Sequence, residues 1–185
     1  MTRLPNTIET YSGHLFDYYA PVVCLEDVAH ALSQTCRFGG HCTKFYSVSE
    51  HSVLVSRIVA GIDPNLALPA LWHDAHEAYS CDIPTPLKKV IGEPLQEIVD
   101  LIDEACAGLL GIDVALFKHP IIKAADQLAI GYEASQLKTG NAWAYTKTVR
   151  HEQAEEAAWS NTLGLEPWEA KKVFILEHRT LVENG

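Results

Sequence analysis

Residues 47–61 read SVSEHSVLVSRIVAG and contain a helix start, a helix body and a helix stop. Ser47 followed by Glu50 fits a capping box, in which each side chain accepts a hydrogen bond from the other residue's backbone N–H. Gly61 suits the end of the segment. The apolar positions that then fall on one helical face are Val48, Val55, Ile58 and Val59. The stretch therefore predicts a helix of about four turns with one buried face.

Helical periodicity continues over most of the chain from about residue 24. Further helices are expected over residues 26–35, 65–79, 94–110, 119–138, 150–163 and 166–182. Residues 36–46 and 81–86 are expected to be loops, the second stiffened by prolines. Residues 1–23 combine Pro5, Gly13 and Pro21 with a cluster of aromatics, which is typical of an arm of loops or short strands. The sum is an all-α fold, a compact bundle of about seven helices.

The length of 185 residues favours one domain. We expect an N-terminal arm over residues 1–23, a core over 24–137 and C-terminal helices over 138–185. The 24 Asp and Glu against 14 Lys and Arg give a net charge of −10, which argues against binding to a nucleic-acid polymer or an anionic membrane.

The chain offers neither a transmembrane run of about 18 apolar residues nor the start of a secretory signal. The chain has five cysteines, an odd number, and no two of them are spaced as Cys-x-x-Cys. These features predict reduced thiols and a cytoplasmic location.

Ionisable residues interrupt the apolar faces of several expected helices. His51 lies three residues after Val48, and His73-Asp74 follows a strongly apolar run. Asp126 lies four residues after Ile122. Burying such groups costs free energy unless something compensates for it. Imidazoles and carboxylates from three helices suit a borderline-to-hard divalent ion, so the pattern favours a metal site.

Each of these residues also has a plain structural interpretation. His51 fits a core histidine bonded to a backbone carbonyl, and His73-Asp74 fits a structural pair. Asp126 fits an ion pair with Arg37 or a lysine. Glu77, four residues after His73, fits a solvated helix residue.

Motifs of several other enzyme classes are missing. His73-Asp74-Ala75-His76-Glu77 is neither His-Glu-x-x-His nor its inverted form, which disfavours a zinc peptidase. The sequence has no P-loop, no Gly-x-Gly-x-x-Gly and no Gly-x-Ser-x-Gly. P-loop and Rossmann nucleotide binding are therefore disfavoured.

The order and spacing of these residues resemble those of the HD-domain metal-dependent phosphohydrolases, over about residues 24–137. The resemblance is closest to bacterial 5′-deoxynucleotidases and to phage deoxyadenosine triphosphate hydrolases. It rests on Cys36-Arg37-Phe38, Ser49-Glu50-His51-Ser52, His73-Asp74-Ala75-His76-Glu77, Asp82-Ile83-Pro84-Thr85-Pro86-Leu87-Lys88 and Ala124-Ala125-Asp126. The fold that the resemblance implies is an HD-domain helical bundle.

The resemblance implies one divalent metal ion, of which Mn, Co, Zn, Ni, Fe and Mg are candidates. Its ligands would be His51, His73, Asp74 and Asp126. Glu77 would handle the proton of the attacking water, and Asp74 would share that task. Arg37 would hold phosphate during catalysis.

The substrate residues are also implied by the resemblance. Phe38 stands where the deoxynucleotidases have Trp and would lie against the sugar. Asp82 would bind the 3′-hydroxyl of deoxyribose, and Lys88 would add positive potential for the phosphates. His76 departs from the small residue of the deoxynucleotidase motif and would contact further phosphates or a second metal ion.

The function expected is hydrolysis of a deoxynucleoside mono- or triphosphate by water that a metal activates, in a homo-oligomer. The location would be the cytoplasm of a bacterium or of a phage-infected host. Two alternatives stay open: a non-catalytic HD-type module that binds a nucleotide as a regulator, and a hydrolase of a nucleotide second messenger.

Overall fold

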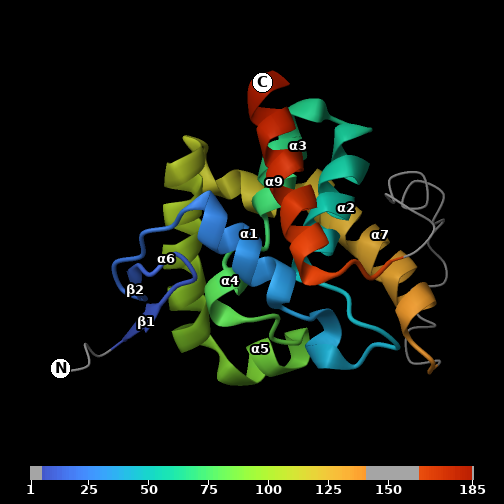
Figure 1. Cartoon of the computed structure of the whole chain (residues 1–185), viewed down its shortest axis with the longest axis horizontal. Helices are drawn as coiled ribbons and strands as arrows, with labels where there is room; N and C mark the ends of the chain where they lie inside the picture. The colour runs from blue at the N-terminus through green and yellow to red at the C-terminus, as the bar shows by residue number, and fades with distance from the viewer. Residues whose placement is uncertain (1–5, 141–162, 185) are drawn as a thin grey trace.

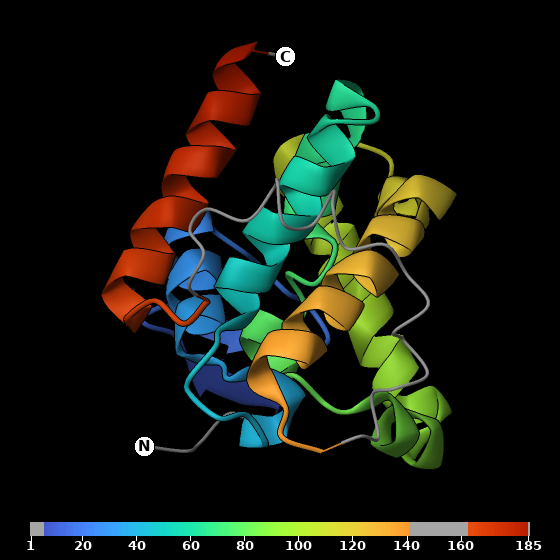
Figure 2. The same ribbon diagram turned by 90° about the vertical axis from the view of Figure 1, so that its right-hand side faces the viewer.

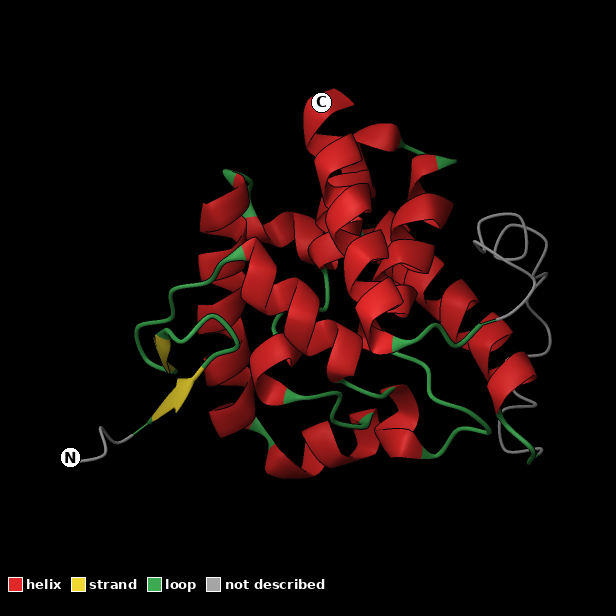
Figure 3. Ribbon diagram, viewed as in Figure 1, coloured by secondary structure: helices red, strands yellow, loops and turns green. Residues whose placement is uncertain are grey.

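The structure is a computed structural model that describes residues 6–140 and 163–184. Its helices are α1 (Leu25–Gln34), α2 (Val48–Ala60), α3 (Ala67–Trp72), α4 (Glu77–Ser80), α5 (Thr85–Ile91), α6 (Glu93–Leu110), α7 (Pro120–Leu137) and α9 (Pro167–Asn184). Short 3-10 helices are η1 (Arg37–Gly40), η2 (Pro64–Leu66) and η3 (Val114–Lys118). Figure 3 shows how little strand there is beside them. The mostly helical fold predicted from the sequence is confirmed.

Helix α2 is the centre of the bundle. The Ser47–Glu50 capping box forms as predicted. The helix packs against α1, α3, α7 and α9, so it is buried around most of its circumference and not along a single face. Figure 2 shows α9 on one side of the molecule and α6 and α7 on the other. Two hydrophobic clusters meet at α2, one centred on Trp72 and Phe174 and the other on Ile58 and Ile122.

The expected helix over residues 65–79 is broken in the structure. Helix α3 ends at Trp72, and α4 begins only at Glu77. In between, the backbone N–H groups of Ala75 and Glu77 bond three residues back, to Trp72 and Asp74. This tighter turn changes the direction of each side chain, so Glu77 is not simply one helical turn beyond His73 on the same face.

Other boundaries agree with the sequence or differ locally. Helices α1, α2, α6, α7 and α9 were predicted to within a residue or two. The loop expected over residues 81–86 ends earlier than predicted, because helix α5 begins at Thr85 and its first turn accommodates Pro86. The inward side of α6 is Val99, Ile102 and Cys106, while Leu109 near its end is 49% exposed. The helix expected over 150–163 lies outside the described residues.

The N-terminal arm is a hairpin that packs on the helical body (Figure 1). Strands β1 (Thr7–Glu9) and β2 (Leu15–Asp17) pair antiparallel. Phe16 is 1% exposed, and its ring stacks on Tyr79 at 3.9 Å. Tyr18 donates a hydrogen bond to the Tyr79 carbonyl. In the described parts of the chain, no helix is long and apolar enough to cross a bilayer.

Candidate metal centre

Three separate elements bring the predicted ligands together. His51 lies on α2, His73 and Asp74 on the turn after α3, and Asp126 on α7. The Nε2 atom of His51 is 3.1 Å from Oδ1 of Asp126 and 3.6 Å from Oδ2 of Asp74. The Nε2 atom of His73 is 3.2 Å from that same Asp74 oxygen. Ligands of one ion at about 2.0–2.2 Å stand roughly 3.0–3.5 Å apart, so this spacing suits a metal.

The two imidazoles are oriented for ligation. Nδ1 of His73 lies 2.8 Å from the Ala70 carbonyl, and Nδ1 of His51 lies 2.7 Å from Oε1 of Glu133. A carbonyl or a carboxylate only accepts, so each Nδ1 carries the proton and donates. In the neutral imidazole, which is the form that binds a metal, each Nε2 would then carry the lone pair. Both Nε2 atoms are buried and lie 3.1 and 3.2 Å from carboxylate oxygens, yet neither forms a hydrogen bond of good geometry among the described residues, and a metal ion would give both a partner.

The electrostatics of the cluster favour a positive charge. Burial and the neighbouring Arg37 lower the pKa of His51, but Glu133 and Asp126 outweigh them and raise it to about 10. Burial raises the pKa of Asp74, yet His73 and His51 bring it well below its usual value. The same carboxylates that hold protons on the imidazoles would stabilise a divalent cation in their place. The structure therefore has His and Asp groups close enough to hold a metal ion.

Glu133 is a site residue that the sequence analysis did not identify. It is fully buried on α7 and accepts a hydrogen bond from the Tyr46 hydroxyl at 2.9 Å as well as the bond from His51. It lies seven residues after Asp126, which places both on one face of α7 two turns apart. That spacing was the available signal. The carbonyl partner considered for His51 is wrong, because a carboxylate takes its place.

Arg37 reaches the cluster from η1. It is 6% exposed, with Nε 3.3 Å from Oε2 of Glu133 and Nη1 3.7 Å from Oδ2 of Asp74. Burial lowers its pKa, but these carboxylates more than compensate and raise it. Arg37 therefore lies beside the expected ligands as a permanent cation. The ion pair considered between Arg37 and Asp126 is replaced by the pairs with Glu133 and Asp74.

Phe38 and Asp82 are joined across the edge of the site. The backbone N–H of Phe38 donates to Oδ2 of Asp82 at 2.8 Å. Phe38 has a φ of 58°, and Cys81, next to Asp82, has a φ of 65°. Left-handed backbone is costly for residues other than glycine and concentrates at functional sites. Two such residues on facing segments mark this edge as one that the fold constrains.

Glu77 and Lys88 form a pair next to Asp74. Nζ of Lys88 donates to Oε1 of Glu77 at 2.9 Å, while Oε2 is buried with no hydrogen-bond partner in the described residues. Burial and the nearby Asp74 raise the pKa of Glu77 to about 7. Glu77 is 2% exposed, so the solvated alternative is wrong. Lys88 is engaged with this carboxylate.

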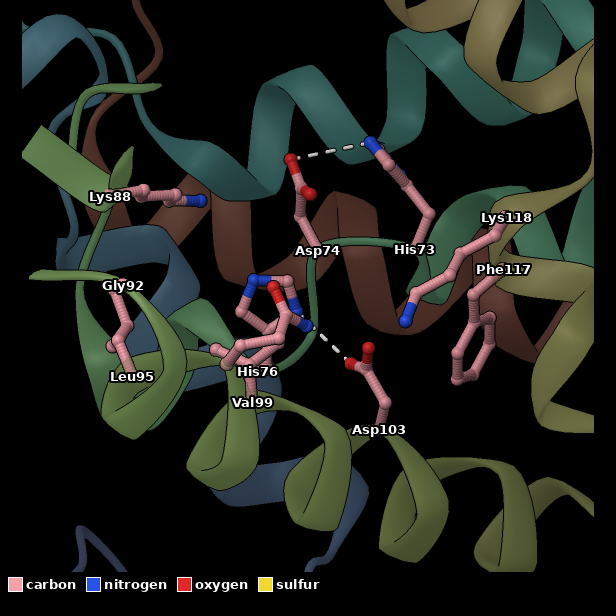
Figure 4. A pocket seen from close by; sticks show the side chains of 11 residues that line it. His73, Asp74, His76, Lys88, Gly92, Leu95, Val99, Asp103, Phe117 and Lys118 are labelled. Carbon is pink, nitrogen blue, oxygen red and sulfur yellow. Dashed lines mark hydrogen bonds and ion pairs between the residues drawn. The ribbon is translucent and has the colours of Figure 1, made fainter. Parts of the chain in front are cut away.

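His76 lies on the far side of Asp74, in the wall of a cavity of about 250 Å³. Its Nδ1 atom is 3.0 Å from Oδ1 of Asp103, a buried partner on α6. Figure 4 shows His73, Asp74 and His76 among the side chains that line this cavity, with Lys88 and Lys118 on opposite sides. The structure thus brings all ten predicted site residues into one region.

Comparisons with known proteins give relatives but no function. No protein-family model matches the chain. It is 41% identical over 108 residues to the uncharacterized protein YfdR of Escherichia coli, an alignment that spans 55% of this chain and 58% of YfdR. It is 36% identical over 138 residues to the uncharacterized protein RCAP_rcc00048 of Rhodobacter capsulatus, spanning 68% of this chain and 70% of that protein. The chain therefore belongs to the same protein family as RCAP_rcc00048.

Proposed function

We propose that this protein is a metal-dependent phosphohydrolase of the HD-domain type that acts on deoxynucleotides. The observation that supports it most is the pair of buried imidazoles, His51 and His73, whose Nδ1 atoms are hydrogen-bonded and whose Nε2 atoms lie beside the carboxylates of Asp126 and Asp74. A metal ion would give both nitrogens and both carboxylates one common partner.

The metal would be held by His51, His73, Asp74 and Asp126. Such an ion polarises a phosphate oxygen and makes water a nucleophile near neutral pH. The carboxylates of Asp74 and Asp126 are 20% and 26% exposed, whereas His51 is fully buried. The imidazole of His51 would thus hold the inner side of the ion, and the carboxylates border the side from which a substrate arrives.

Glu77 would accept the proton of the attacking water. Its Oε2 atom has no partner among the described residues, and Lys88 fixes the other oxygen, so the carboxylate is held in one orientation. A positioned general base contributes about 10²–10⁴-fold in rate. Lys88 would also limit the repulsion between Glu77 and an anionic substrate.

Arg37, Phe38 and Asp82 would bind the substrate. The chain has a net charge of −10, so attraction for a phosphate must be local, and Arg37 is the buried cation nearest to Asp74. One carboxylate oxygen of Asp82 accepts the hydrogen bond from the Phe38 N–H, which leaves the other oxygen for the 3′-hydroxyl. The Phe38 ring would lie against the sugar and leave no room for a 2′-hydroxyl.

The test is a panel of deoxy- and ribonucleoside mono- and triphosphates, incubated with metal-loaded protein and analysed by chromatography. Phosphate from monophosphates, or tripolyphosphate from triphosphates, supports the proposal and identifies the substrate. Tight nucleotide binding without turnover would favour a regulatory module instead. Turnover restricted to a guanosine alarmone or a cyclic dinucleotide would favour the second-messenger alternative. The matched control is Asp126→Ala, which should retain the fold and lose activity.

A further inference from the structure

A second group of metal-binding side chains lies where the N-terminal arm meets α1. His14 comes from the end of the turn between β1 and β2, Cys24 is the N-cap residue of α1, and Asp27 lies in the first turn of that helix. One donor atom from each of the three lies within 4.8 Å of the others. None of them belongs to the candidate metal centre, which holds no cysteine. The two groups can therefore be distinguished by their ligand chemistry.

The distances between the three donors suit a tetrahedral ion. Sγ of Cys24 is 3.3 Å from Oδ2 of Asp27, and Nδ1 of His14 is 3.9 Å from the same oxygen. Ligands at about 2.3 Å for sulfur and 2.0–2.2 Å for nitrogen and oxygen stand roughly 3.4–3.6 Å apart around zinc. The His14 side chain is 73% exposed, and its Nδ1 atom lies 3.0 Å from the Ser12 hydroxyl, so binding the ion would exchange that contact for a shift of a few tenths of an ångström.

Asp27 is held in place before any ion arrives. It is 4% exposed, and its two oxygens accept hydrogen bonds from the backbone N–H and the hydroxyl of Ser12, each at 2.8 Å. Partners of this kind orient a ligand and are part of most metal sites. Both of these hydrogen-bond donors belong to Ser12 in the N-terminal arm, so the arm already contacts α1 at this point.

An independent observation comes from the cavity beside Asp27. Asp27 and Tyr79 line the same space of about 330 Å³. The Tyr79 hydroxyl is buried and has no hydrogen-bond partner among the described residues, and the residue is only 7% exposed. Buried polar groups without partners are rare, and a bound water or ion is a common reason. Of the three proposed ligands only Asp27 lines this cavity, and an ion with three protein ligands keeps a fourth position, which a water molecule can fill.

We propose that His14, Cys24 and Asp27 form a zinc site that fastens the N-terminal arm to α1. A thiolate, an imidazole and a carboxylate select zinc over magnesium or calcium, which prefer oxygen ligands alone. The ion would tie the turn of the hairpin to the helix, while Phe16 and Tyr18 hold its second strand on α4. This site stands whether or not the candidate metal centre is catalytic.

Cobalt titration of the untagged, metal-free protein tests the proposal. A cysteine thiolate gives bound Co²⁺ an intense sulfur-to-metal charge-transfer absorption, which imidazoles and carboxylates do not. We expect this absorption in the wild type and its displacement by equimolar Zn²⁺. It should persist in His73→Ala, which removes a ligand of the other centre, and it should vanish in Cys24→Ser.

Two further variants complete the test. Cys81→Ser removes an exposed free cysteine and should leave the absorption unchanged. His14→Ala alters an exposed side chain, so it should fold normally, yet it should weaken cobalt binding by at least ~10-fold, since even outer partners of a ligand are worth that much. The proposal is overturned if the wild type shows no thiolate absorption, or if Cys24→Ser or His14→Ala binds as the wild type does.

Discussion

Nδ1 of His51 donates a hydrogen bond to Oε1 of Glu133 at 2.7 Å, in a part of the protein that water does not reach. The bond fixes the tautomer of His51 and aims Nε2 at Asp74 and Asp126. Glu133 also faces Arg37, so one carboxylate on α7 orients a ligand from α2 and a cation from η1. The geometry of the candidate metal centre depends on this residue as much as on the ligands.

Glu133→Gln should therefore weaken metal binding by about 10–100-fold, the usual effect of losing an outer-shell carboxylate. The amide has nearly the shape of the carboxylate, but it has no negative charge to balance the positive charge of Arg37. Tyr46→Phe is the matched control, because it removes only the hydroxyl that donates to Glu133. Isothermal titration of the metal-free proteins measures the metal affinity of both variants. Equal affinities for Glu133→Gln and the wild type would show that Glu133 does not position His51.

Glu77→Gln should separate proton transfer from metal binding. We expect kcat to fall by about 10²–10⁴-fold, with KM and metal content close to those of the wild type. Glu97→Gln makes the same chemical change on an exposed part of α6 and should leave both parameters unaltered. Near wild-type kcat in Glu77→Gln would reduce Glu77 to a structural partner of Lys88.

Asp82 should determine the choice of sugar. Asp82 is half-buried, and an acceptor that a bound substrate covers and leaves without its donor costs about 1–3 kcal/mol, so 2′-deoxynucleotides should exceed 2′,3′-dideoxynucleotides in kcat/KM by the corresponding factor. Asp82→Ala should remove this difference and leave bound metal intact. Asp82→Asn keeps an oxygen for the Phe38 N–H and separates loss of that bond from loss of the sugar contact. If Asp82→Ala keeps the wild-type preference, the 3′-hydroxyl is recognised elsewhere.

Phe38 should show the cost of its left-handed backbone. Phe38→Gly and Phe38→Ala both delete the ring, so their difference reports the backbone alone. With φ at 58°, the glycine variant should be more stable than the alanine variant by about 1 kcal/mol. Urea unfolding of both proteins gives the two free energies. An alanine variant as stable as the glycine variant would mean that the segment relaxes to an ordinary conformation.

Much of the fold could be predicted because its signals are local. The capping box at Ser47 and the α6 stop at Gly111, which has a left-handed φ of 67°, depend on residues next to each other in the chain. The break after Trp72 was missed because His73–His76 contains no proline or glycine to signal it. The turn that replaces the helix there positions His73 and Asp74 for the contacts that they make with other elements.

The candidate site was predicted in its residue types but not in its supporting contacts. Charged residues on apolar faces are visible in a sequence, so His51 and Asp126 could be found. The residues that orient the histidines of the site lie far away in the sequence. Glu133, the partner of His51, is 82 residues away, and Asp103, the partner of His76, is 27 residues away. The left-handed backbone at Phe38 likewise has no local signal, because it depends on a hydrogen bond to Asp82, 44 residues further on.

Hydrolysis before and after removal of metal tests the central claim most directly. Protein freed of metal by exhaustive chelation should release neither phosphate nor tripolyphosphate from any deoxynucleotide. Addition of Mn²⁺ or Co²⁺ should restore the activity in the wild type and not in His73→Ala. Full activity in protein that elemental analysis finds free of metal would contradict the account.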